Sequence, residues 1–183
     1  MGCKINYFSP LDDRCLPPAD GLILCGGYPE LYAEKLSQNT SMLSDIKEKI
    51  TDGMPVIAEC GGFMYLHEKL RTEENEYHMV GALEKTVFST DKLQRFGYIN
   101  MCAEKGGLLL KKGEEIKAHE FHYWDSEANG CDFHAVKPDG REWHCGHSTK
   151  TSYMGFPHLY FYANINAAAN FVTACADYGE QNG

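Results

Sequence analysis

Apolar runs that end in glycine alternate with amphipathic stretches in the first third of the chain. "GLILCGG" (21–27) and "PVIAECGG" (55–62) have the pattern of buried parallel strands that run into glycine loops. Residues 29–37 and 41–51, between these runs, have helical spacing of apolar side chains, and Pro29 is favoured in a first helical turn. The pattern predicts strand, helix, helix and strand in that order.

The remaining elements follow from the same patterns. "KINYF" (4–8) alternates like a short strand, and residues 77–162 alternate between turn signals as mostly antiparallel strands do. Residues 164–179 predict a closing helix. A helix beginning at Cys60–Gly61 is predicted from four apolar residues at helical spacing, Phe63, Met64, Leu66 and Leu70.

Alternating strands and helices with glycines at the strand ends predict an α/β fold, an open mixed sheet flanked by helices. Ligands of such sheets bind beyond the carboxyl ends of the strands. Both glycine loops should therefore lie at one edge, where a site is expected. Residues 1–183 contain no repeat and no linker composition, so we expect one domain.

Charge and composition narrow the class of function. A net charge of −9 argues against nucleic acid or an anionic membrane as the main partner. No apolar stretch is long enough to span a membrane, and the first residues lack the pattern of an export signal, so we expect a cytoplasmic protein. The eight cysteines lack the spacing of a zinc site, so we expect no metal. A disulfide framework would need a secretory context, so we expect mostly buried, reduced thiols.

Cys60 lies where the second strand gives way to a helix. The helix dipole and free N–H groups there favour a thiolate, and small neighbours let a substrate approach. The N–H of Gly61 and the loop at Gly26–Gly27 are candidate donors to an oxyanion. The alternative is that Cys60 packs in the core and that the glycines only form a turn.

A thiol nucleophile needs a base, and His158 in "SYMGFPHLYF" is placed to reach the same edge. His67 is expected on the helix after Cys60 as a solvated or capping residue. His119 and His122 in "HEFHYW" invite a metal hypothesis, but residues three apart in a strand face opposite sides. That segment is expected to be a half-buried strand near the active edge.

Five motifs in order, "FSPLDD", "GGYPELYAEKL", "AECGGFMYL", "HEFHYW" and "GFPHLYFYAN", resemble the glutamine amidotransferase domain of cobyrinic acid a,c-diamide synthase. The resemblance implies a class I, flavodoxin-like fold. It implies that Cys60 attacks the side-chain amide of L-glutamine and that His158 activates the thiol and protonates the ammonia. It places Gly26, Gly27, Gly61 and Tyr28 at the oxyanion and glutamine-binding positions.

The resemblance also implies the partners. Full-length relatives carry an ATP-binding synthetase domain that activates corrinoid carboxylates and amidates them with this ammonia. No cofactor is expected in this chain, since ATP and Mg belong to the synthetase, whose phosphate loop of the form GxxxxGK[ST] is missing here. The first strand and helix of the family's domain are also missing, so a fragment, natural or made for expression, or a split subunit is expected. An unfilled sheet edge predicts self-association into a homo-oligomer.

Two departures from the family leave roles open. Most class I glutaminases have a glutamate two residues after the histidine, where this chain has Tyr160. Glu59 or Glu120 is the candidate to orient His158, and His122 is a candidate pocket residue. Trp124 replaces a usually small residue, which leaves the role of "HEFHYW" open.

Alternatives to the implied family function remain. The same architecture amidates a nickel tetrapyrrole precursor, cobyric acid and cell-wall lipid intermediates, and "GGYPEL" with "HEFHYW" favours the a,c-diamide branch over the last two. A non-catalytic binding module that keeps the fold is the second class of function.

Overall fold

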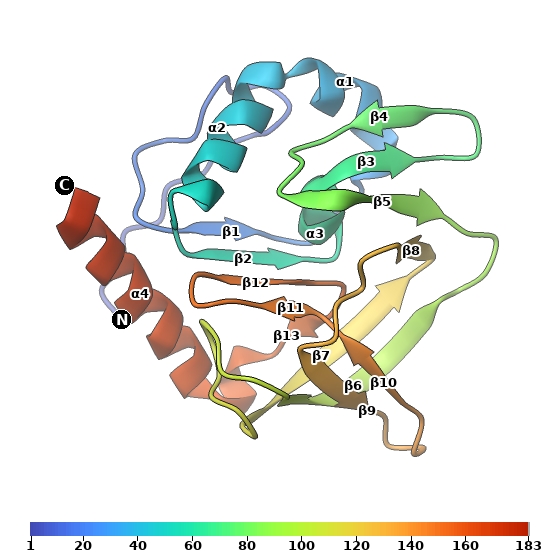
Figure 1. Cartoon of the computed structure of the whole chain (residues 1–183), viewed down its shortest axis with the longest axis vertical. Helices are drawn as coiled ribbons and strands as arrows, with labels where there is room; N and C mark the ends of the chain where they lie inside the picture. The colour runs from blue at the N-terminus through green and yellow to red at the C-terminus, as the bar shows by residue number, and fades with distance from the viewer. Residues whose placement is uncertain (183) are drawn as a thin grey trace.

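The central sheet of the computed structural model, which describes residues 1–182, contains the predicted parallel strands (Figure 1). Its order is β1-β2-β12-β11, with β1 (Leu22–Leu24), β2 (Val56–Glu59) and β12 (Ser152–Gly155) parallel and β11 (His147–Ser148) antiparallel to β12. Ile57 pairs with both Ile23 and Tyr153. β2 thus lies between two parallel neighbours, as its continuous apolar run predicts.

Helices connect these strands as predicted. Residues 29–37 form a 3₁₀ turn, η1 (Pro29–Tyr32), followed by α1 (Ala33–Gln38), and α2 (Thr40–Thr51) follows. Met42 and Ile46 of α2 are fully buried against the sheet, which contributes about 1.5–3 kcal/mol each. The helix ends before Gly53, whose φ of +88° favours glycine. The closing helix is α4 (Ile165–Asn182), preceded by η2 (Phe161–Ala163).

The helix predicted after Cys60 is much shorter than expected. α3 covers only Gly61–Tyr65, and the chain continues as β3 (His67–Arg71), so the helical prediction for Leu70 is wrong. β3 pairs with β5 (Leu83–Ser89), and the register shifts between His67 and Lys69. This bulge lets two residues three apart both face inward, which imitates helical spacing.

A second, four-stranded sheet contains this strand, with order β4-β3-β5-β8, where β4 is Glu76–His78 and β8 is Trp124–Ser126. His67 is fully buried in it rather than solvated or capping, so that prediction is also wrong. Its Nδ1 lies 2.9 Å from the carbonyl of Phe63 and its Nε2 lies 2.6 Å from Oγ of Ser126. Burial lowers the pKa of His67 to about 4.

The third sheet is five-stranded, with order β10-β9-β6-β7-β13. Its strands are β6 (Arg95–Ala103), β7 (Glu115–His122), β9 (Phe133–Val136), β10 (Glu142–Cys145) and β13 (His158–Leu159). Along β7 the residues Ile116, Ala118, Glu120 and His122 are buried, and those between them are not. This confirms the predicted half-buried strand in which His119 and His122 face opposite sides.

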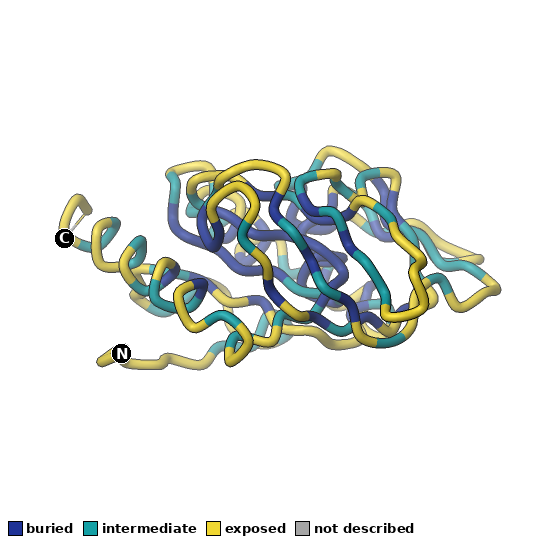
Figure 2. The backbone as a smooth tube through the Cα atoms, turned by 90° about the horizontal axis from the view of Figure 1, so that it is seen from below, coloured by how far each residue is buried: buried dark blue, intermediate teal, exposed yellow. Residues whose placement is uncertain are grey.

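The first 21 residues form neither helix nor strand, so the strand predicted at residues 4–8 is wrong. No neighbouring strand pairs with this segment, and its residues are mostly exposed (Figure 2). β1 is therefore the edge of the central sheet, and Ile23 on it is 52% exposed. Alternation of apolar and polar residues does not form a strand unless a neighbouring strand supplies the backbone hydrogen bonds.

Two further findings concern the whole described chain. No helix within residues 1–182 is long and apolar enough to cross a membrane. All eight cysteines are free thiols, but only Cys145 is buried, so the expectation of mostly buried thiols is wrong. Several lie in connecting loops, as Cys3 and Cys15 do, where polar neighbours keep them at the surface.

Candidate active site

Cys60 lies at a sharp corner between β2 and α3. Its φ of +48° makes it the one non-glycine residue with positive φ among residues 1–182. Such a conformation costs about 1–3 kcal/mol and persists only where neighbours hold it. Here the N–H of Cys60 donates to the carbonyl of Gly155 on β12, 2.9 Å away. The corner pushes the side chain out of the strand, as strand-to-helix nucleophile turns do.

The two glycines after Cys60 let α3 pack directly on the end of β1. A Cβ at Gly61 would lie 2.5 Å from the carbonyl oxygen of Gly27, and one at Gly62 would lie 2.2 Å from that of Leu24. Both obstacles are backbone atoms, which cannot rotate away. "ECGG" is therefore a close-packed corner, and the two glycine loops meet at one sheet edge as predicted.

His158 on β13 lies beside this corner. Its imidazole packs against Gly26, where a Cβ would lie 2.4 Å from Cε1 of the ring. A side-chain hydrogen bond to Cys60, and then the carboxylate of Glu59, raise the pKa of His158 to about 10, against a smaller opposing effect of burial. The imidazole is therefore positively charged at neutral pH, and it sits next to the sulfur.

Glu59 contacts the other side of the same imidazole. Its Oε2 lies 3.6 Å from Nδ1 of His158, and its Oε1 accepts a hydrogen bond of 3.0 Å from the N–H of Leu159. Because the carboxylate is tied to the backbone of β13, it fixes the ring relative to the strand. Of the two candidates to orient His158, the structure brings Glu59 to it.

Glu120 and His122 are not brought to Cys60. They lie on the inner face of β7, where Glu120 Oε1 is 3.5 Å from His122 Nε2 and His122 stacks on Phe156 at 4.0 Å. Tyr160, two residues after His158, is 57% exposed. Within residues 1–182 no three His, Cys, Asp or Glu side chains converge as metal ligands do.

The loop beside Cys60 presents free backbone donors. Within residues 1–182, the N–H groups of Gly27 and Gly61 donate to no other backbone group. Space beside Gly27 is open, since a Cβ there would meet no atom within 4 Å. Tyr28 follows on the same loop and is 69% exposed. One N–H group of the loop and one at the start of α3 are thus available beside Cys60, and an oxyanion hole needs two such donors.

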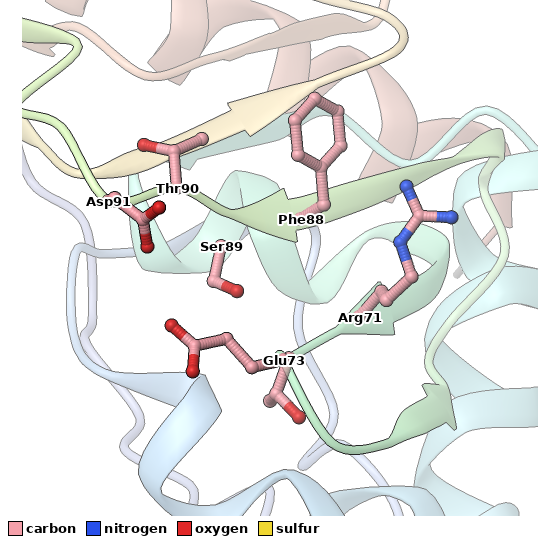
Figure 3. A pocket seen from close by; sticks show the side chains of 7 residues that line it. Arg71, Glu73, Phe88, Ser89, Thr90 and Asp91 are labelled. Atoms are coloured by element: carbon pink, nitrogen blue, oxygen red, sulfur yellow. The ribbon is translucent and has the colours of Figure 1, made fainter.

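A pocket on another part of the described chain lies away from this corner. It has a volume of about 510 Å³ at the ends of β3 and β5 and is lined by Arg71, Thr72, Glu73, Phe88, Ser89, Thr90 and Asp91 (Figure 3). Arg71 lies over the ring of Phe88 at 5.5 Å. None of the predicted site residues lines this pocket.

Sequence patterns missed a second polar cluster. Trp143 and Arg95 line a small cavity together with Glu120 and His122. Neither residue belongs to a motif with recognisable spacing. Arg95 on β6 and Trp143 on β10 come near β7 only because these strands belong to the same sheet. The buried positions of Glu120 and His122 in an apolar alternation were the one available signal.

The fold and the corner together define a class of protein: an α/β domain with a Cys–His pair at the end of a parallel strand and a glycine loop beside it. Residues 2–165 match the family model described as the CobB/CobQ-like glutamine amidotransferase domain. The chain belongs to this family. That match confirms the resemblance drawn from the five motifs.

Curated relatives are similar over nearly the whole chain. The chain is 44% identical over 188 residues to a cobyrinate a,c-diamide synthase of Caldanaerobacter subterraneus, covering 99% of this chain and 41% of that protein. It is 40% identical over 175 residues to the protein of that name from Picrophilus torridus, covering 95% and 38%. The chain thus spans about two fifths of the length of these relatives.

Solved structures confirm the predicted fold class. The structure of PurLQS from Thermotoga maritima has a TM-score of 0.57 at 17% identity and covers 92% of this chain and 83% of that one. A crystal structure of a glutamine amidotransferase has a TM-score of 0.53 at 15% identity, covering 86% and 79%. At these identities the likeness concerns the fold alone.

Proposed function

We propose that the chain hydrolyses L-glutamine and supplies ammonia for ATP-dependent amidation of corrinoid carboxylates, as the glutaminase part of a cobyrinate a,c-diamide synthase. The single observation that carries this proposal is the corner at which Cys60 meets a His158 held by Glu59. The names of the curated relatives supply the substrate class.

The geometry supports a two-step hydrolysis. The sulfur of Cys60, as thiolate, attacks the side-chain amide carbon of glutamine, and the amide oxygen takes the negative charge toward the N–H groups of Gly27 and Gly61. The C–N bond then breaks while the imidazolium of His158 gives its proton to the leaving nitrogen. Ammonia and a glutamyl thioester result.

The second step reverses the roles. Neutral His158 accepts a proton from water, and the resulting hydroxide oxygen attacks the thioester carbon. The C–S bond breaks, glutamate leaves, and Cys60 and the charged His158 are restored. Glu59 touches no substrate atom in this scheme and acts as a positioning residue for the ring.

A synthetase partner, in which ATP and Mg are bound, would use the ammonia. An exposed aromatic face supports its docking beside the site: Phe96, Tyr98, Phe121 and Tyr123 are 59%, 76%, 50% and 49% exposed. Tyr98 packs edge-on against His119 at 5.1 Å, and His119 pairs with His158 across β7 and β13. Paired residues lie on one side of a sheet, so this aromatic face adjoins the histidine. Exposed aromatic patches of this kind are typical of protein interfaces.

A nickel tetrapyrrole is the alternative substrate of the whole enzyme, and a binding module without activity is the alternative class. The relatives' shared name favours the corrinoid. The intact contacts among Cys60, His158 and Glu59 favour activity over a remnant.

We also propose that the chain self-associates through the free edge of β1, where Ile23 is exposed. Sedimentation at micromolar concentration is expected to show a dimer or larger species that Ile23→Lys shifts toward monomer. A wild-type chain that sediments as a monomer would exclude this association.

Labelling with a glutamine-analogue electrophile, followed by peptide mass mapping, tests the glutaminase. We expect one adduct, on Cys60, that disappears in Cys60→Ala. Cys25→Ala is the matched control, because Cys25 is exposed and follows β1 beside the same loop. An adduct on Cys25, or one that persists in Cys60→Ala, would refute the assignment.

A further inference from the structure

A row of four buried aromatic rings runs through the core next to the active corner. His122 stacks on Phe156, with ring centroids 4.0 Å apart and planes 7° apart. Phe156 meets Phe63 edge-on at 5.1 Å, and Phe63 meets His67 edge-on at 4.6 Å. Each of the four residues is at most 7% exposed, so this ring row is shielded from solvent along its whole length.

The two middle rings of the row belong to the two segments that carry the Cys–His pair. Phe63 lies in α3, three residues after Cys60, and Phe156 comes two residues before His158. Their contact therefore joins the segment of the nucleophile to the segment of the base. An edge-to-face contact prefers one relative orientation as well as one distance, because the edge of a ring is positive and its face is negative. The contact thus opposes both a shift and a rotation of either segment.

The short helix α3 depends on such contacts. It has only five residues, and a helix of that length is not stable without tertiary packing. Its first two residues, Gly61 and Gly62, pack on the backbone at the end of β1, which attaches the start of the helix. An attachment at the start leaves the rest of the helix free to swing about it. Phe63 supplies an attachment further along, on the segment that leads to the histidine.

The two outer rings of the row are both anchored to β8. Nδ1 of His67 donates to the carbonyl oxygen of Phe63, 2.9 Å away, and its Nε2 lies 2.6 Å from Oγ of Ser126. At the other end, Nδ1 of His122 donates to the carbonyl oxygen of Trp124 over 2.7 Å. Trp124 and Ser126 are the first and last residues of β8. One strand therefore fixes both ends of the ring row, so the middle rings are held from either side.

We propose that Phe63 and Phe156 are positioning residues that hold His158 within hydrogen-bonding reach of Cys60. They act through the backbone of two segments and not on a reacting atom. Because a misplacement of about 1 Å can cost about a hundredfold in rate, loss of their contact should be visible in catalysis. The consequence for catalysis rests on the proposed glutaminase, whereas the position of the imidazole beside the sulfur can be tested without glutamine.

Alkylation of Cys60 by iodoacetamide across a range of pH, read by peptide mass mapping, is the test without glutamine. A positive charge beside a thiol favours the reactive thiolate, so the reaction reports on the imidazolium next to the sulfur. Phe156→Leu should move the rise of the alkylation rate toward higher pH by about one unit. Phe133→Leu is the matched control, because Phe133 is 2% exposed and meets Tyr153 edge-on at 5.5 Å in the other core cluster. It should lower the melting temperature as Phe156→Leu does and leave the pH of the rise unchanged.

Glutamine hydrolysis supplies the second readout. Phe63→Leu and Phe156→Leu should each lower kcat about ten- to hundredfold with KM nearly unchanged, and the double variant should lose no more than either single variant. Melting curves check folding, and Phe156→Met takes the place of a Phe156→Leu protein that does not fold.

The outcomes separate this proposal from the proposed function. An alkylation profile that is unchanged in a folded Phe156 variant, or that moves equally in Phe133→Leu, overturns the positioning role, and so do losses of kcat that multiply in the double variant. A wild-type protein that releases no ammonia while the alkylation profile moves as expected would refute the glutaminase and support the positioning role.

Discussion

This protein contains two Glu–His pairs, one between β2 and β13 and one within β7. Their separations are similar, but their exposures differ. Glu59 and His158 are 3.6 Å apart, with 37% of the histidine side chain exposed, and Cys60 completes the set. Glu120 and His122 are 3.5 Å apart, and both side chains are nearly inaccessible. The first pair is open to a substrate and the second is closed around a small cavity. Environment, rather than residue type, therefore decides which pair is accessible beside a cysteine.

Removing each histidine in turn should separate the two pairs most clearly. His158→Asn should lower glutamine hydrolysis about 10²–10⁴-fold, because the proton donor to the leaving nitrogen is lost. His122→Asn should change the rate less than about tenfold, since it touches no reacting atom. Ammonia release measured under saturating glutamine checks both. Equal losses in the two variants would contradict the distinction.

The corner at Cys60, beside the Glu59–His158 pair, depends on close contact between backbone atoms. The Glu120–His122 pair has no such requirement. Gly62→Ala should destabilise the protein by about 3 kcal/mol, because the new Cβ would meet the carbonyl oxygen of Leu24 at 2.2 Å. Gly27→Ala is the control, since open space surrounds that position. Denaturant unfolding measures the stability of both variants. A Gly62→Ala protein as stable as the wild type would show that the backbone at this corner can move to make room for the new Cβ.

The pKa of a third histidine, His67, is also set by its environment, because burial outweighs the small opposing effect of the Glu127 carboxylate. Its pKa is lowered to about 4 from 6.5, so the unfolded chain binds more protons between these values. Stability is fully present above pH 6.5 and should fall by roughly 3 kcal/mol as pH drops to 4. His67→Gln should flatten this acid dependence in unfolding curves. An unchanged slope would contradict the buried neutral state.

A smaller expected effect, on the pH dependence of Cys60 labelling, should distinguish Glu59 from Glu120. Glu59 helps to raise the pKa of His158 to about 10, so the charged ring is lost only as pH rises through that value. Glu59→Gln keeps an acceptor for the Leu159 N–H but lowers this pKa, so the alkaline fall in the rate of Cys60 labelling should move to lower pH. The rate at its maximum should drop about tenfold. Glu120→Gln should leave the alkaline fall in place, and a matching shift there would overturn the assignment.

Much of the active corner was predictable from the sequence, because each part has a local signal. Apolar runs closed by glycine identified β1 and β2, and the residue between strand and glycines identified Cys60. His158 was identified by its place between a predicted strand and the closing helix, from which it could reach the same edge. These inferences need only the chain direction and the rule that parallel strands end together.

The errors in secondary structure share one physical cause, which is that pairing between distant segments overrides local pattern. The bulge in β3 placed His67 and Leu70 on one face, so a strand had helical spacing. Residues 4–8 alternate but have no neighbouring strand to pair with. The choice between Glu59 and Glu120, and the part of Trp143 in the second cluster, depended on contacts across sheets that no local pattern encodes.

The proposed chemistry requires Cys60 to form a covalent bond to glutamine with His158 beside it. Acid quenching of the protein during turnover of glutamine, followed by peptide mass mapping, looks for that bond itself. We expect a glutamyl thioester on the peptide that contains Cys60, formed with loss of the side-chain amide nitrogen and lacking in Cys60→Ala. A protein that releases ammonia while this peptide stays unmodified, or that forms the adduct on Cys25, would contradict the proposed chemistry.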